Sequence, residues 1–196
     1  WSASPFHTWL AARNLPYVIY CNGDTELQTL YADRAHTLVL GAARLTGTHY
    51  RFDIYESRDG NYKRINQDKV NADLPVLFKP LGSPLPKPCY VASDADFVDY
   101  ITELMGGFAV PGWLKQYRTG KRYVFLGMRF TRDTERMVMS DLIYGAGAPG
   151  GWAFIAEPTA KEKRFCERKN IQVVEADWRD FVEGNAPRVN PFASSQ

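Results

Sequence analysis

Cysteine and histidine are scarce in this chain, and it has no long apolar run. Its 196 residues include three cysteines and three histidines, and no cysteines are spaced as C-x-x-C or as zinc ligands. The cysteines Cys21, Cys89 and Cys166 are far apart, which argues against a disulfide framework and predicts free thiols in the cytoplasm. A membrane span needs about 18 to 20 consecutive apolar residues, and no stretch approaches that length. The amino terminus also lacks the basic start and apolar run of a signal peptide. We therefore expect no metal site and no membrane association.

An excess of charge of one sign is lacking as well. The chain has 24 lysines and arginines against 22 aspartates and glutamates. This near-balance gives no case for nucleic acid as a partner. Hydrophobic residues make up 45% of the sequence, which is enough for a sizeable core. The length favours one domain, which we place at residues 1–183, with an excursion at 41–73 and a polar tail at 184–196.

Strand patterns alternate with helix patterns along the chain. Short β-branched and aromatic runs predict strands at residues 17–21, 37–40, 74–79, 122–127, 151–156 and 171–174. Capping residues and helical periodicity predict helices at 4–14, 25–33, 93–105, 111–117, 133–144, 159–169 and 177–183. The stretch 41–71 predicts a strand or hairpin on the surface, with a turn at Arg58-Asp59-Gly60. The fold class is therefore α/β, with a mainly parallel sheet flanked by helices.

Sheets of this class bind ligands at the carboxyl ends of their strands. The loops at these ends are Asn22-Gly23-Asp24, Lys79-Pro80-Leu81-Gly82-Ser83, Gly127-Met128-Arg129 and Glu157-Pro158. Lone carboxylates such as Glu26 or Asp53 have no visible partner in the sequence, and hydrolase, metalloprotease and phosphate-loop motifs are missing from the chain. We therefore predict no catalytic residue.

The order of these segments resembles the later two-thirds of a sirtuin-like domain, over roughly residues 15–183. Such domains carry a strand ending in a Thr-Asn-x-Asp type motif, and a later strand ending in Lys-x-His-Gly-Ser before an Asp-rich helix start. A further strand ends in Phe-x-Gly-x-Ser with a downstream Asp. The matching segments are Tyr20-Cys21-Asn22-Gly23-Asp24, Lys79-Pro80-Leu81-Gly82-Ser83, Ser93-Asp94-Ala95-Asp96-Phe97, and Phe125-Leu126-Gly127-Met128-Arg129 with Asp133. The resemblance implies an incomplete Rossmann-type fold and a residual ligand pocket formed by Asn22, Asp24, Gly82, Ser83, Gly127 and Asp133.

Three departures from the family pattern argue against NAD chemistry. Leu81 stands where the family has its general-base His, and an isobutyl group cannot accept a proton. Arg129 stands where the family has a small Ser or Thr near the ribose, and it adds bulk and charge. Before Tyr17 we predict one short helix and no Gly-rich strand–helix unit for the pyrophosphate. The glycines at 145–151 follow a helix and precede a strand, which is the reverse of a nucleotide loop. We therefore expect no cofactor.

The remaining candidates have local explanations. His7, His36 and His49 do not fall at the strand end that carries Leu81, and we expect surface or local structural roles for them. For Asn22 and Asp24 we favour an Asx-type turn that caps a helix.

Three functions stay open. The first is a non-catalytic, protein-binding accessory factor, whose partner-binding residues would be Tyr50, Arg51, Tyr55, Arg58, Tyr62 and Arg64, since Tyr and Arg are enriched at interfaces. The loop 80–88, with its four prolines, is a second candidate surface. The chain is similar in length and in its lost motifs to short sirtuin-like proteins associated with bacterial nitrogen fixation, which implies nitrogenase or an assembly intermediate as partner. The second function is an NAD-consuming hydrolase or deacylase whose Gly-rich unit lies upstream of Trp1. The third is a nucleotide-binding sensor without turnover.

Overall fold

The computed structural model describes residues 4–43 and 50–185, which form two compact units. Unit 1 is Trp1–Trp113 and unit 2 is Leu114–Gln196. The expected single domain over residues 1–183 stays a prediction. His49 and the tail from residue 186 lie outside the described residues.

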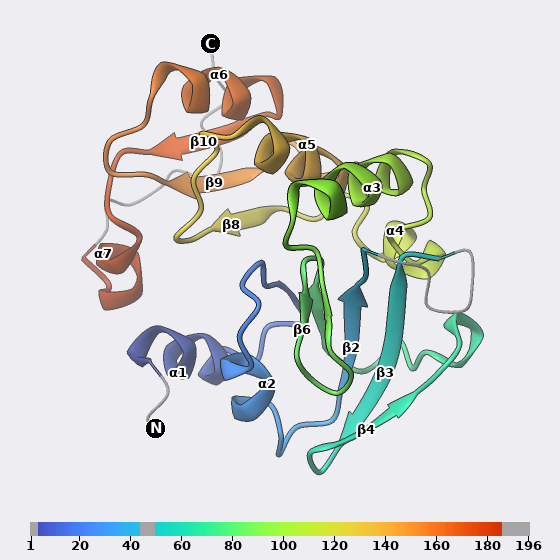
Figure 1. Cartoon of the computed structure of the whole chain (residues 1–196). Coiled ribbons are helices and arrows are strands. Elements are labelled where there is room, and N and C mark those ends of the chain that lie inside the picture. Colours follow the sequence, from blue (N-terminus) through green and yellow to red (C-terminus); the bar gives the residue numbers. More distant parts are fainter. Residues whose placement is uncertain (1–3, 44–49, 186–196) are drawn as a thin grey trace. The chain divides into compact units, whose positions relative to one another are not determined.

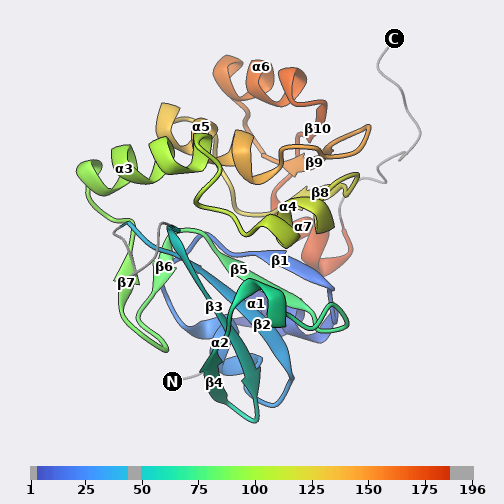
Figure 2. The same cartoon turned by 90° about the vertical axis from the view of Figure 1, so that its right-hand side faces the viewer.

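The main sheet of unit 1 has five strands in the order β1-β5-β2-β3-β4 (Figures 1 and 2). The strands are β1 (Tyr17–Ile19), β2 (His36–Gly41), β3 (Phe52–Arg58), β4 (Asn61–Arg64) and β5 (Val76–Lys79). β5 lies between β1 and β2 and is parallel to both, so that Leu77 is in register with Val18 on one side and Leu38 on the other. The carboxyl ends of three parallel strands therefore meet at one edge of the sheet, where we expected the site.

The predicted hairpin at residues 41–71 is formed, and it is part of this sheet. β3 runs antiparallel to β2 from the pair His36–Ser57 to the pair Gly41–Phe52, and β4 pairs with β3. The turn is at Asp59 and Gly60, which both have positive φ angles (50° and 73°), as tight two-residue hairpins require. Since most of β3 is buried, this hairpin extends the sheet instead of standing out from it.

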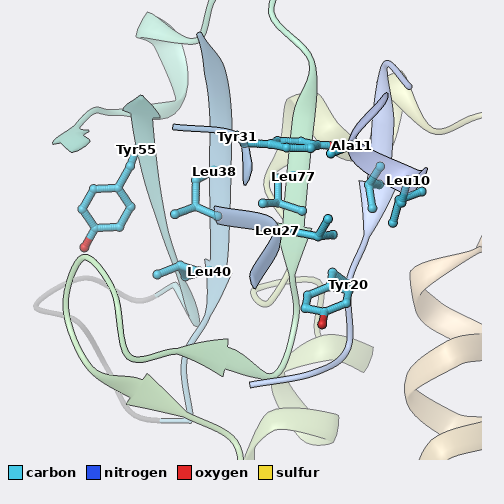
Figure 3. Packing of buried hydrophobic residues seen from close by; sticks show 10 residues of the cluster. Leu10, Ala11, Tyr20, Leu27, Tyr31, Leu38, Leu40, Tyr55 and Leu77 are labelled. Carbon is cyan, nitrogen blue, oxygen red and sulfur yellow. The ribbon is translucent and has the colours of Figure 1, made fainter. Parts of the chain in front are cut away.

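The core of unit 1 forms where two helices pack against the sheet. α1 (Pro5–Ala12) contributes Leu10, and α2 (Glu26–Leu30) contributes Leu27. They pack with Leu38 and Leu77 from the central strands (Figure 3). Tyr20, just beyond β1, closes this cluster at one end and directs its hydroxyl away from the leucines (Figure 3).

The rest of unit 1 is a short hairpin and a long helix. The hairpin is β6 (Gly82–Ser83) with β7 (Cys89–Tyr90), and it is followed by α3 (Asp94–Met105). Ser93 caps α3 as predicted, in a capping box with Asp96. A 3₁₀ helix occupies Gln67–Lys69, and α4 (Gly112–Tyr117) crosses the boundary between the units.

Unit 2 has a three-stranded sheet in the order β10-β9-β8, in which both pairs are parallel. Its elements are β8 (Tyr123–Phe125), α5 (Asp133–Leu142), β9 (Gly151–Phe154), α6 (Ala160–Arg168), β10 (Ile171–Val174) and α7 (Trp178–Glu183). The glycines at 145–151 connect α5 to β9, as the sequence predicts. Parallel strands flanked by helices in both units confirm the predicted fold class.

Candidate functional site

A polar cluster lies at the carboxyl end of β1. The Tyr20 hydroxyl donates to Asp24 Oδ2 at 2.7 Å, and His7 Nε2 lies 2.5 Å from the same hydroxyl oxygen. Because the one hydroxyl proton goes to Asp24, His7 must donate its Nε2 proton to Tyr20. Burial, and then the hydrogen bond to Asp24, raise the pKa of Tyr20 above its ordinary value. We call His7, Tyr20, Asp24, Glu26 and Lys79 the strand-end cluster.

His7 is a member of this cluster that the sequence did not reveal. It is 9% exposed, so of the two roles expected for it, surface or local structural, it has the structural one. Its Nδ1 lies 2.5 Å from Ser4 Oγ and contacts the Glu26 carboxylate. The contact with Ser4 is local, whereas the contact with Tyr20 joins α1 to the end of β1. His36 is also buried, with Nδ1 2.8 Å from the Arg34 carbonyl oxygen.

Asp24 forms the expected Asx-type turn. Its Oδ1 accepts a hydrogen bond from the backbone N–H of Glu26, the first residue of α2, at 2.9 Å. Asn22 is exposed, and its Nδ2 approaches the Tyr20 hydroxyl at 3.4 Å. The family's polar pair therefore starts a helix here and holds Tyr20.

Lys79, the last residue of β5, is fully buried. Its ammonium donates to the backbone carbonyl of Asp24 and lies 5.0 Å from the centre of the Tyr20 ring. Burial lowers the pKa of Lys79 to about 8, an effect that the negative charge of Asp24 partly offsets. Lys79 thus ties the loop after β5 to the loop after β1.

We expect this buried ammonium to make stability depend on pH. The pKa of Lys79 is about 8 in the folded protein against 10.5 ordinarily, so between these values the unfolded chain binds more protons and stability rises with pH. The free energy of unfolding of the wild type, relative to Lys79→Met, should rise by about 2 kcal/mol between pH 7 and pH 10. Urea unfolding of both proteins at several pH values measures this. A difference that does not change with pH would contradict a buried, titrating Lys79.

Gly82 and Ser83 have structural roles in the hairpin after β5. Gly82 has a φ of 87°, and a Cβ there would lie 2.1 Å from the Cys89 carbonyl oxygen. The buried Ser83 hydroxyl donates to Gln28 Oε1 at 2.5 Å, and Gln28 Nε2 donates to the Leu85 carbonyl at 3.0 Å. The Gly-Ser pair therefore anchors the proline-rich loop to α2.

Gly127 and Asp133 lie in unit 2. Gly127 is exposed and has a φ of 66°, and a Cβ there would meet the Trp178 ring at an ordinary 3.7 Å. Asp133, the first residue of α5, is exposed and pairs with Arg136. The other four residues of the expected pocket belong to unit 1, and the six-residue pocket stays a prediction.

Arg129 is held by a buried carboxylate in unit 2. Its Nε and Nη2 donate to the two oxygens of Glu162 at 2.7 and 2.8 Å. Glu162 is fully buried and also accepts hydrogen bonds from the backbone N–H groups of Phe130 and Thr159. Burial alone would raise the pKa of Glu162, but these hydrogen bonds outweigh it and lower the pKa to about 2. The arginine that we expected to obstruct a ribose thus has a structural partner.

A family model for the SIR2-like domain matches residues 22–174 of this chain. That match covers more than half of the sequence, and it runs from Asn22 in the loop after β1 to Val174, the last residue of β10. The chain belongs to the SIR2-like family. No curated protein and no solved structure matches it.

Within this SIR2-like domain, Leu81 lies two residues after Lys79 of the strand-end cluster. It is half-buried, and its backbone carbonyl accepts a hydrogen bond from Val91 at 3.1 Å. Its side chain offers neither a proton acceptor nor a donor. His7 is the histidine of the strand-end cluster, and it reaches that cluster from α1.

The expected partner-binding tyrosines of the SIR2-like domain differ in exposure. Tyr50 is 41% exposed, and Tyr62 is half-buried. Tyr55 is 6% exposed and belongs to the core cluster, which does not fit the partner-binding role expected for it. Both faces of β3 are covered, so that neighbouring residues on it are buried together.

The three arginines of that expected surface are all paired within unit 1. Arg51 pairs with Glu103, Arg58 with Glu56, and Arg64 with Asp53. A partner would have to compete with these carboxylates. Binding by this surface of the SIR2-like domain stays a prediction.

The cysteines are free thiols as expected, Cys166 buried and Cys21 and Cys89 half-buried. Within residues 4–43 and 50–185, no group of three or more His, Cys, Asp or Glu is placed to hold a metal ion. None of the helices in that part of the SIR2-like chain has the length and apolarity to cross a bilayer.

Proposed function

We propose that this SIR2-like protein is a non-catalytic accessory factor that acts by binding another protein. The observation that carries this proposal is the use of the family's motif residues in folding. Asp24 starts α2 and holds Tyr20, Lys79 bonds the Asp24 carbonyl, and Ser83 bonds Gln28. Each of these groups already has a partner within unit 1.

A general base for NAD cleavage is also missing at position 81, where the family has its histidine. General-base catalysis needs a group that accepts a proton at the reacting centre, and Leu81 has none. Three other cluster groups are engaged in the fold, and the first of them is His7, which contacts Ser4 and Tyr20. Lys79 is buried against a carbonyl, and the pKa of Tyr20 is raised.

As partner we propose a nitrogenase component or an assembly intermediate in a nitrogen-fixing bacterium. Support comes from the similarity in length and lost motifs to the sirtuin-like proteins associated with those systems. On this proposal the protein acts in the cytoplasm, which agrees with its three unpaired cysteines.

We expect the full-length gene product to neither cleave nor bind NAD. NAD turnover followed by product chromatography, and titration calorimetry with NAD, should both give no signal. Leu81→His should stay inactive, because the surrounding motif residues remain engaged in the fold. Turnover at rates typical of the family would contradict the proposal, and binding without turnover would support a nucleotide sensor instead.

The same preparation provides the positive arm of this test. Each purified nitrogenase component is mixed with the protein and passed over a sizing column. As a control, the component is replaced by an unrelated protein whose acidity is similar to that of the component. Co-elution with one component alone is expected. If neither the components nor the assembly intermediates co-elute with the protein, the choice of partner is wrong. The NAD experiments would still test whether the protein is catalytic.

A further inference from the structure

An open hollow lies between α5 and α6 of unit 2. Its volume is about 690 Å³, and its lining comes from these two helices and the residue that caps α6. The lining residues are Asp133, Arg136, Met137, Ser140, Phe165, Arg168 and Lys169. We call this hollow the α5–α6 groove.

The groove has an unbalanced positive charge. Its one carboxylate, Asp133, is paired with Arg136, which also donates to the Phe130 and Thr131 carbonyls at 2.5 and 2.8 Å. Arg168 is exposed, and no ion pair of its side chain is found among the described residues. Lys169 is a further cation of the lining, and its charge acts on the carboxyl group of Asp141.

A basic stripe on α6 continues this charge beyond the groove. Lys161, Arg164 and Arg168 are all exposed and are spaced three and four residues apart, which places them on one face of a helix. The neighbouring basic residue Lys163 faces elsewhere and pairs with Glu175. The stripe therefore leads from Arg168 in the groove to two further cations on α6 outside it.

The bottom of the groove is apolar. The Met137 side chain is 45% exposed, although it is large and hydrophobic. Phe165 also lines the groove, is 2% exposed, and has its ring centre 4.9 Å from that of Phe130. A flexible thioether such as that of Met137 accommodates apolar groups of varied shape.

We propose that the α5–α6 groove binds an acidic segment of a partner protein, which places an apolar side chain on Met137 and carboxylates against Arg168 and the α6 stripe. Charge complementarity identifies the occupant, since cations border an apolar floor. The open shape fits a protein surface better than a small ligand, because small-ligand sites enclose most of their ligand. This inference rests on the proposed function and gives the chemistry of the partner's contact.

The test uses the full chain with ¹³C-methyl-labelled methionine. The sequence has four methionines, Met105, Met128, Met137 and Met139, so the spectrum is simple, and Met137→Leu assigns the relevant signal. The probe is a synthetic peptide in which glutamates flank a central phenylalanine. The control peptide has glutamine at every glutamate position.

We expect the acidic peptide to shift the Met137 signal, to leave Met105 in unit 1 unchanged, and to bind more weakly as salt is added. Arg168→Glu should weaken binding about fivefold or more, because reversal turns an attraction into a repulsion. Arg122→Glu is the matched control, since Arg122 is an exposed cation of unit 2 outside the groove, and it should have little effect.

Four results would overturn the inference: no Met137 shift, an equal shift with the glutamine peptide, equal weakening by both arginine variants, or the same shift with inorganic phosphate alone. None of them bears on NAD turnover or on nitrogenase co-elution. Failure of the groove is therefore distinguishable from failure of the proposed function.

Discussion

Glu162→Ala is expected to lower the free energy of unfolding by about 3 kcal/mol, since removing a buried carboxylate leaves its donors unsatisfied. The backbone N–H groups of Phe130 and Thr159 lose their acceptor, and Arg129 loses both of its bonds to the carboxylate. Arg129 itself is half exposed, so water partly compensates it. Urea unfolding followed by circular dichroism measures the loss.

The matched control is Glu167→Ala on the same helix. Glu167 is exposed, and its replacement should change stability by no more than about 0.5 kcal/mol. Equal effects of the two substitutions would show that Glu162 is not the anchor of this part of unit 2.

The Glu162 carboxylate should also make the stability of the protein depend on pH in the acidic range. The pKa of Glu162 is lowered to about 2 from 4.5, so its stabilisation is complete above pH 4.5 and is lost as pH falls through 2. The stability gap between the wild type and Glu162→Gln should therefore narrow between pH 5 and pH 2. A constant gap would argue that the carboxylate is not ionised in the folded protein.

Gly41→Ala is expected to lower the free energy of unfolding of unit 1 by about 3 kcal/mol or more, by overpacking against backbone that cannot move freely. Gly41 ends β2 and pairs with Phe52. A Cβ at this position would lie 1.8 Å from the Pro80 carbonyl oxygen and 2.6 Å from its carbon. The strand end and the loop after β5 would have to separate, which would disturb Lys79 next to Pro80. Thermal and urea unfolding measure the loss.

Gly23→Ala is the control for this substitution. A Cβ at Gly23 would lie 3.7 Å from the Tyr90 ring, which is an ordinary contact, and stability should change by no more than about 0.5 kcal/mol. If Gly41→Ala were as stable as Gly23→Ala, the close approach of β2 and the Pro80 loop would be wrong.

Much of the fold could be predicted because its signals are local. Apolar runs marked the parallel strands, Ser93 marked the start of α3, and Asp59-Gly60 marked the hairpin turn. The Asx-type turn of Asp24 was also predictable, since its hydrogen bond spans two residues.

The site was predicted less well because its contacts are distant in sequence. His7 and Tyr20 are 13 residues apart, and the bonds from Lys79 to Asp24 and from Ser83 to Gln28 each span 55 residues. No periodicity or motif specifies such pairings. Tyr55 was misjudged for a related reason, because burial of both faces of β3 depends on what packs there and not on alternation within the strand.

The bond between Lys79 and the Asp24 carbonyl has a consequence for how such proteins evolve. It links two motif loops through one buried contact, so a substitution in either loop changes the packing of the other. A role in packing can preserve such residues after a loss of enzymatic turnover. Drift to a residue such as leucine at position 81, which holds no such bond through its side chain, would be tolerated. In proteins of this kind, motif residues that persist reflect their role in folding. They are poor evidence that catalytic activity has been retained.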